Sequence, residues 1–159
     1  MAKYRIGLVG GGGIANNHIQ GCKSVLSDLG EVVAGCDPNT ETLNSFCDQY
    51  DLSLRFTDVE FLIGSEEVDV IALLTPPAVR SEVIFPAIER GIHLLIEKPF
   101  GETYADAESF VLAAEQAGVA LAINHELGFM KDVTLMHEAH AAGAIGKIRY
   151  IAHDQFQNR

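Results

Sequence analysis

The feature that most constrains the fold is an apolar segment, residues 4–9, that runs directly into four consecutive glycines, residues 10–13. The segment is short and contains Ile and Val, as a buried strand does. The glycines remove every side chain where the chain must turn, and Ile14 and Ala15 then begin a helical pattern. Strand, glycine turn and helix form the context in which Gly-x-Gly-x-x-Gly/Ala favours binding of a dinucleotide.

The positions of this turn have different expected roles. Gly10 permits the tight turn, Gly12 lets the backbone approach a pyrophosphate, and Ala15 keeps the helix close to the strand. Gly13 and Ile14 lie at the expected start of the helix, where free N–H groups and the positive end of the helix dipole favour an anion. The alternative is a flexible glycine turn that binds no ligand.

Strand patterns alternate with helical patterns along the chain. The expected strands are residues 4–9, 32–36, 52–56, 68–74, 93–96 and 119–123, with a last strand at 147–155. The expected helices are residues 14–29, 40–50, a short helix capped by Asp58, 78–90, 103–117 and 131–142. This alternation is typical of the α/β class with a doubly wound parallel sheet, the Rossmann NAD(P)-binding fold.

The sequence predicts one dinucleotide-binding Rossmann domain and the beginning of another domain. We expect the first over residues 1–123, and a linker helix with the first strand of a truncated C-terminal substrate domain over residues 124–159. The strand at 147–155 needs partner strands from another sheet, and the sequence does not supply them. Only the start of a C-terminal α+β domain is therefore expected.

Polar, proline and glycine residues follow the expected strands where each strand ends. Asp37 follows the second strand, Thr75-Pro76 follows the central apolar strand, and Glu97-Lys98-Pro99 follows the next one. Ligands of a doubly wound sheet bind outside the carboxyl ends of its strands. We therefore expect these residues to lie together at the functional edge of the sheet.

Asp37 stands about 20 residues after Ala15, the spacing at which dinucleotide-binding folds place an acidic residue. A carboxylate there accepts hydrogen bonds from ribose hydroxyls and repels a 2′-phosphate. No Arg or Lys in residues 38–42 would neutralise such a phosphate. The sequence therefore favours NAD over NADP, and a helix-capping role for Asp37 stays open beside this one.

Lys98 is the candidate catalytic residue. A lysine between a carboxylate and a proline, just past a buried strand, is placed to move a proton to or from a hydroxyl during hydride transfer. The Lys98–Pro99 bond is a candidate for the cis form. The alternative is a surface lysine in a turn, paired with Glu97.

Composition and charge argue against several classes of function. A net charge of −11 over 159 residues disfavours nucleic acid and anionic membrane surfaces as partners. Residues 1–5 lead into a strand without a signal-peptide pattern, and no apolar run has transmembrane length. Cys22, Cys36 and Cys47 form no metal or redox motif, so we expect a cytoplasmic chain with reduced thiols.

A metal site is not expected either. His137 and His140 share a helical pattern with Glu138, but the two histidines are three residues apart. The zincin motif requires two histidines four residues apart on one helix face.

These motifs together resemble the N-terminal part of the Gfo/Idh/MocA family, the glucose–fructose oxidoreductase and inositol dehydrogenase group. The resemblance rests on residues 10–15, on Cys36-Asp37-Pro38-Asn39, on Thr75-Pro76-Pro77 and above all on Glu97-Lys98-Pro99. It implies a two-domain NAD(P)-dependent oxidoreductase of sugars, inositols or related polyols. It also implies that Lys98 orients the substrate hydroxyl and shuttles its proton, with Glu97 and Thr75-Pro76 lining the cofactor site.

Three departures from the family stand out. Arg80 and Gly128 occupy positions where the family often has histidine and arginine, respectively. Family members are also roughly twice as long, and their second domain carries an aspartate and a histidine that complete the catalytic set. The sequence therefore predicts a cofactor-binding part that is weakly active or inactive alone. A non-catalytic NAD-binding sensor or regulatory module is the alternative.

The expected partner is a small polyol or sugar, bound only if a second domain is supplied. The missing domain would leave apolar surface uncovered around Phe129, Met130 and residues 145–156. Association of two copies through that surface, as a homo-oligomer, is a further expectation.

Overall fold

The computed structural model describes residues 3–152 and residue 154. The chain divides into two compact units, Met1–Asn124 and His125–Arg159. The first contains the sheet, and the described residues of the second form a short 3₁₀ helix and one α-helix. Each unit is described by itself below.

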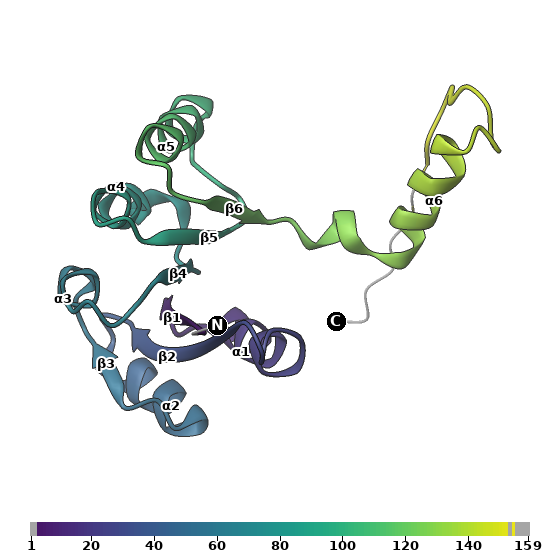
Figure 1. The fold of residues 1–159 in the computed structure, drawn as a ribbon. Coiled ribbons are helices and arrows are strands. Elements are labelled where there is room, and N and C mark those ends of the chain that lie inside the picture. Colours follow the sequence, from purple (N-terminus) through teal and green to yellow (C-terminus); the bar gives the residue numbers. More distant parts are fainter. Residues whose placement is uncertain (1–2, 153, 155–159) are drawn as a thin grey trace. The chain divides into compact units, whose positions relative to one another are not determined.

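One six-stranded parallel sheet organises the first unit, in the order β3-β2-β1-β4-β5-β6 (Figure 1). The strands are β1 (Tyr4–Val9), β2 (Gly30–Cys36), β3 (Leu54–Phe56), β4 (Val70–Leu73), β5 (His93–Glu97) and β6 (Leu121–Asn124). The order reverses between β1 and β4, which is the switch point of a Rossmann fold. The predicted fold class is confirmed.

Helices cover both faces of this sheet (Figure 1). The α-helices are α1 (Gly13–Val25), α2 (Thr40–Tyr50), α3 (Val59–Gly64), α4 (Ser81–Glu89) and α5 (Tyr104–Ala117), with the 3₁₀ helix η1 (Pro77–Val79) before α4. One core cluster joins the sheet to α1 and α2 through Ala15, Ile19 and Phe46. A second, larger cluster joins it to α3, α4 and α5 through Leu62, Ile84 and Phe110.

Local sequence explains where several helices begin and end. Asn39 caps α2 by accepting the N–H of Thr42, and Thr103 and Asp106 form a reciprocal capping box at the start of α5. Asp58 caps α3, as the sequence predicts. Gly118 ends α5 in the left-handed conformation at φ 69°, which favours glycine.

The first helix is shorter than predicted. It ends at Val25 rather than Leu29, because the chain turns at Leu26, whose carbonyl accepts the N–H groups of Leu29 and Gly30. Gly30 is the first residue of β2 instead of a helix cap. A Cβ there would lie 3.1 Å from Ile6 Cδ1, so close packing against β1 explains this glycine.

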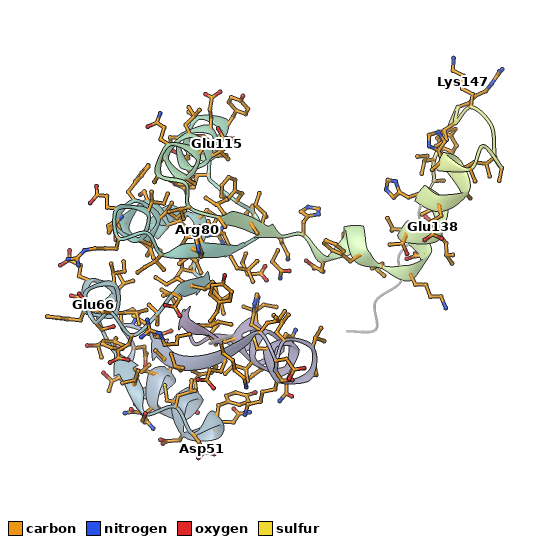
Figure 2. The ribbon with its side chains drawn as sticks, in the orientation of Figure 1. Asp51, Glu66, Arg80, Glu115, Glu138 and Lys147 are labelled. Carbon is orange, nitrogen blue, oxygen red and sulfur yellow. The ribbon has the colours of Figure 1, made fainter. Side chains whose placement is uncertain are left out.

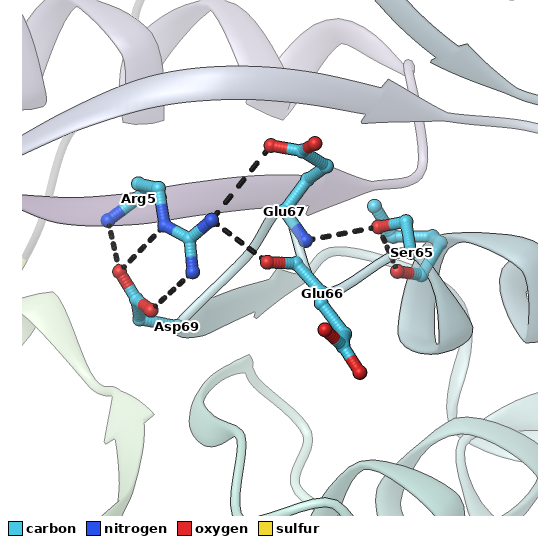
Figure 3. Close-up of polar contacts among 6 residues, drawn as sticks. Arg5, Ser65, Glu66, Glu67 and Asp69 are labelled. Carbon is cyan, nitrogen blue, oxygen red and sulfur yellow. Dashed lines mark hydrogen bonds and ion pairs between the residues drawn. The ribbon is translucent and has the colours of Figure 1, made fainter.

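At the amino edge of the sheet, Arg5 joins the start of β1 to the segment before β4 (Figure 3). Its backbone N–H and side chain donate three hydrogen bonds to Asp69, at 2.8, 3.2 and 2.8 Å. Its Nη1 donates to the Glu66 carbonyl at 2.7 Å. These bonds from Arg5 lower the pKa of Asp69 below its usual value.

The three cysteines are free thiols. Cys36 and Cys47 lie in the core, while Cys22 on α1 is half-buried. Burial raises the pKa of Cys36 to about 12, with a further contribution from nearby carboxylates. The predicted core role of Cys36 is confirmed.

The second unit contains η2 (Glu126–Phe129) and α6 (Lys131–Ala141), and no residue of either is buried. The strand predicted at 147–155 is wrong for its described residues, since 147–152 and 154 are in no strand. A strand needs a neighbour for its backbone hydrogen bonds, and none is paired with this described segment. Residues 153 and 155 lie outside the described part.

Phe129, Tyr150 and Ile151 are mostly exposed. Phe156, which belongs to the predicted association surface, lies outside the described part, and association of two copies stays a prediction. No helix in the described ranges is long and apolar enough to cross a membrane.

Candidate functional site

The carboxyl ends of β1, β2, β4 and β5 are aligned, so the loops that follow these strands begin side by side. Val9 is paired with Cys36 on one side and with Leu73 on the other, and Leu73 is in turn paired with Ile96. Each of these four residues is the last or next-to-last of its strand. The candidate residues Gly10, Asp37, Thr75, Glu97 and Lys98 all follow within two positions of these residues.

Gly10 adopts a backbone conformation that favours glycine. Its φ is 105°, and its N–H donates to the Cys36 carbonyl at 2.8 Å. A Cβ at this position would lie 3.3 Å from the carbonyl carbon of Leu74. The turn after β1 therefore requires glycine for both conformation and space.

Asp37 is hydrogen-bonded to the glycine turn. Its Oδ2 accepts the Gly11 N–H at 2.8 Å, and its Oδ1 accepts the Asn39 N–H at 2.9 Å. The helix-capping role that the sequence left open for Asp37 belongs to Asn39. The carboxylate is thus held in a fixed orientation and keeps free lone pairs for further donors.

Gly11 is a site residue that sequence reasoning missed. A Cβ there would lie 3.1 Å from Thr42 Cγ2 and 3.4 Å from Asp37 Oδ2. Its place in an unbroken run of glycines, one position beyond the motif glycine, was the available signal.

The start of α1 is open. Gly12 is the N-cap and no side chain caps the helix. Gly12 and Gly13 are exposed, and a Cβ at either would have no heavy atom within 4 Å. A pocket of about 360 Å³ lies beside this turn, lined by residues of the turn, α1 and α2 that include Asn16, Thr42 and Gln49. Ile14 is also exposed, whereas Ala15 is fully buried against the sheet.

Thr75 carries a buried hydroxyl without a hydrogen-bond partner. It is the only such side-chain atom in the described part of the chain. Thr75 follows β4, and a Cβ at Gly10 would lie 3.4 Å from the backbone nitrogen of Thr75. Pro76 is exposed and precedes η1.

Glu97 is buried, with 6% of its surface exposed, and connects three elements. Its Oε1 accepts from Asn124 on β6 and contacts His18 Nε2 on α1 at 2.9 Å. Its Oε2 accepts the Lys98 N–H at 3.1 Å. Burial alone would raise the pKa of Glu97, but hydrogen bonds from His18 and Asn124 outweigh it, and the net shift is downward.

His18 and Asn124 were not predicted as members of this site. Their contacts with Glu97 join residues that are far apart in the sequence, so neither local pattern nor spacing reveals them. The signal in the sequence is weak: a histidine on the helix after the glycine turn and an asparagine at a strand end.

Lys98 has an exposed side chain directly after β5. Of the alternative, the exposed position is observed but the side-chain pairing with Glu97 is not: among described residues the ammonium group has no ion pair, and Lys98 contacts the Glu97 carboxylate through its backbone N–H. The Lys98–Pro99 bond is cis, as predicted. Arg80, a departure from the family, is fully buried and donates to the loops after β4 and β5.

Metal-binding geometry is absent from the described ranges. No group of three or more His, Cys, Asp or Glu side chains there is close enough to hold a metal ion.

Comparison with known proteins agrees with this geometry. The sequence profile of an oxidoreductase family with an NAD-binding Rossmann fold matches residues 4–125. A 1,5-anhydro-D-fructose reductase from Ensifer adhaerens is 34% identical over 143 residues, which is 90% of this chain and 42% of that protein. A D-apiose dehydrogenase from Paraburkholderia graminis is 26% identical over 92% of this chain and 38% of its own length.

Solved structures give the same picture. The WlbA dehydrogenase from Bordetella pertussis, in complex with NADH and UDP-GlcNAcA, superposes with a TM-score of 0.84 at 27% identity. That match covers 89% of this chain and 44% of the other. The chain thus spans about two fifths of the length of the relatives it matches. Profile, relatives and the sheet edge agree, and the chain belongs to the Gfo/Idh/MocA oxidoreductase family.

Proposed function

We propose that this chain is the cofactor-binding part of an NAD(P)-dependent oxidoreductase of sugars, inositols or related polyols. The observation that carries the proposal is the carboxyl edge of the sheet. There an open helix start, an oriented Asp37 carboxylate and the unpartnered Thr75 hydroxyl lie on neighbouring loops. The family profile and relatives that act on sugars support the same assignment.

The residues present fit a dinucleotide. Gly12 and Gly13 have no protein atoms over their Cβ positions, so a pyrophosphate can approach the backbone there. The uncapped start of α1 offers N–H groups and the positive end of the helix dipole to its charge. Thr75 Oγ1 would gain the hydrogen-bond partner that it lacks.

Lys98 is the proposed proton carrier. Bound nicotinamide supplies a hydride acceptor or donor. The lysine amine takes the proton from the substrate hydroxyl oxygen as the carbon-bound hydrogen leaves with its electron pair, and returns it in the reverse reaction. Glu97 accepts the Lys98 N–H and acts by holding the backbone here, because its carboxylate is already occupied by His18 and Asn124.

Asp37 is proposed to select NAD over NADP. Its carboxylate would accept ribose hydroxyls and repel a 2′-phosphate, and Glu41 adds a second negative charge close in sequence. Calorimetric titration with NAD and NADP tests both claims. The unaltered chain should bind NAD more tightly than NADP. Asp37→Ser should lower the ratio of NAD affinity to NADP affinity by about tenfold, which is the contribution of one charge-assisted hydrogen bond.

Asp58→Ala is the matched control, since Asp58 caps α3 and should leave that ratio unchanged. Failure of the unaltered chain to bind either nucleotide would reject the proposed function.

Turnover is the second question. Lys98 is exposed and the chain spans about two fifths of the length of its relatives, so we expect residues 1–159 to bind NAD but to oxidise a panel of polyols and sugars weakly or not at all. NADH absorbance measures this. Rapid turnover by this chain alone would contradict that expectation. Binding without turnover by a longer chain that includes a second domain would favour the non-catalytic NAD-binding module.

A further inference from the structure

We infer that Arg80 is a positioning residue that joins the loops after β4 and β5 and so fixes the backbone that carries Lys98. The inference rests on the proposed function, because Lys98 is the proton carrier there. The hydrogen bonds of the Arg80 side chain go to backbone oxygens of the two loops, and it would act through the loops alone.

The guanidinium group of Arg80 is enclosed and directed at backbone oxygens. Only 1% of the residue's surface is exposed. Figure 2 labels Arg80 among the side chains of the first unit. Nε and Nη2 donate to the Thr75 carbonyl at 3.1 and 2.7 Å. Nη1 donates to the Phe100 carbonyl at 3.2 Å and also to the Pro99 carbonyl. One side chain thereby contacts both loops.

Burying a cation without a hydrogen-bonded carboxylate costs free energy of folding. This cost indicates that the guanidinium group of Arg80 has a role that an apolar side chain could not fill. Burial lowers the pKa of Arg80, and the nearby Glu97 carboxylate works against that shift. An arginine in a protein stays protonated, so its charge must be balanced by the carbonyl dipoles and by Glu97. An apolar side chain would avoid this cost. The hydrogen bonds to two loops are what an apolar residue could not provide.

The shape of the arginine side chain suits this role. Its planar fork presents donors in several fixed directions, whereas lysine offers one point charge. Arg80 also stands at a fixed place, between η1 and α4, where its carbonyl accepts the N–H groups of Val83 and Ile84. The fork therefore extends from an anchored helix start.

The loop that carries Lys98 depends on these bonds. The ammonium group of Lys98 has no partner among the described residues, and its backbone N–H is bonded to Glu97 on the strand side. On the other side, the two residues after it, Pro99 and Phe100, are bonded to Arg80. The same guanidinium fixes the carbonyl of Thr75, whose hydroxyl lacks a partner. Arg80 thus sets the spacing between Thr75, a proposed cofactor contact, and Lys98, the proposed proton carrier.

The test compares Arg80→Met and Arg80→Lys with Arg90→Met in the full chain. Arg90 is exposed at the end of α4 and its side chain has no hydrogen bond among described residues, so it is the matched control. Amide hydrogen exchange is followed at Lys98, Phe100 and Gly101. NADH affinity is measured by calorimetry well below the melting temperature.

For Arg80→Met we expect exchange at these amides to accelerate by about tenfold beyond the change at core strands, and NADH affinity to fall by about tenfold, the worth of one charge-assisted hydrogen bond. Arg80→Lys should recover part of the melting temperature but little of the NADH affinity. The two measurements distinguish a positioning role from a purely structural one. A purely structural role predicts that NADH affinity and melting temperature recover together in Arg80→Lys.

The inference is overturned if folded Arg80→Met matches Arg90→Met in both measurements. It is also overturned if Arg80→Lys restores both to the values of the unaltered chain. Should Arg80→Met fail to fold, Arg80→Lys alone tests the inference, by whether its NADH affinity recovers together with its melting temperature. If the unaltered chain binds no NADH, the proposed function fails, and local exchange at Lys98 and Phe100 still decides whether Arg80 joins the loops.

Discussion

Two arginines, at opposite edges of the same sheet, differ in what they bind and in what surrounds them. Arg5 is at the amino edge, its side chain is 40% exposed, and the Asp69 carboxylate satisfies it (Figure 3). Arg80 is at the carboxyl edge, is fully buried, and its hydrogen bonds go to backbone carbonyls. At the amino edge, opposite charges contact each other directly. The carboxyl edge uses a buried charge to shape loops, and among the described residues it leaves a hydroxyl and an ammonium group without partners.

The comparison teaches how stability and binding are separated in this fold. At the amino edge, Arg5 and Asp69 bind each other, and this contact stabilises the folded chain. The carboxyl edge contains the buried Glu97 carboxylate and the Thr75 hydroxyl, which has no partner among the described residues. Such features cost free energy and are found where a ligand binds.

The largest expected effect is at the carboxyl edge, for Gly10→Ala. The change adds a Cβ at φ 105° and 3.3 Å from the Leu74 carbonyl carbon, so the free energy of unfolding should fall by about 3 kcal/mol. Gly91→Ala is the matched control, at φ 71° with no atom within 4 Å, and should cost about 1 kcal/mol. Urea denaturation measures both. Equal losses would show that the turn is not crowded.

The next effect is that of Glu97→Gln, which removes the charge that His18 and Asn124 stabilise. At neutral pH the free energy of unfolding should fall by about 2 kcal/mol. The pKa of Glu97 is lowered in the folded chain, so its contribution is present above the ordinary value of 4.5 and is lost as pH falls through the folded value. Denaturation curves between neutral pH and pH below that value check this. A stability difference between the unaltered chain and Glu97→Gln that grows as pH falls would contradict it.

Gly12→Ala should separate binding from stability. Its φ of −67° suits alanine and no atom lies within 4 Å of the new Cβ, so the free energy of unfolding should change by less than about 0.5 kcal/mol. NADH affinity should fall by about tenfold or more, because the methyl group occupies the approach to the helix start. Gly21→Ala, inside the helix that follows Gly12, should leave NADH affinity unchanged. Equal NADH affinity for all three chains would remove Gly12 from the site.

The smallest effect is expected at the amino edge, for Arg5→Met. The Arg5–Asp69 pair is partly exposed, so the melting temperature should fall slightly, and by less at high salt. NADH affinity should not change. Thermal denaturation at low and high salt, with calorimetry beside it, measures both. A loss of NADH affinity would show that the two edges are coupled, against the separation of stability and binding drawn above.

Much of the fold could be predicted from sequence because the strands are apolar and the glycines mark turns. The failures have physical causes. Val25, Leu26 and Leu29 continue the apolar spacing of a helix, but the chain turns at Leu26, and Val25 and Leu29 are largely exposed. Residues 147–152 alternate like a strand, but a strand forms only beside a partner.

The candidate site was predictable in its motif positions and not in its connections. Asp37, Thr75 and Lys98 follow strands, so local pattern places them at one edge. The contacts of Glu97 with His18 and Asn124, and of Arg80 with two loops, join distant segments and depend on packing. Tertiary contacts of this kind leave no periodic trace in a single sequence.

The burial of Cys36 and Cys47 has a practical consequence. Burial raises the pKa of all three thiols, but only Cys22 is half-buried, so a maleimide at neutral pH should react first at Cys22. The unaltered chain therefore offers a single labelling position on α1, the helix whose first residues line the glycine turn. A fluorophore attached there would report on that helix without any mutation.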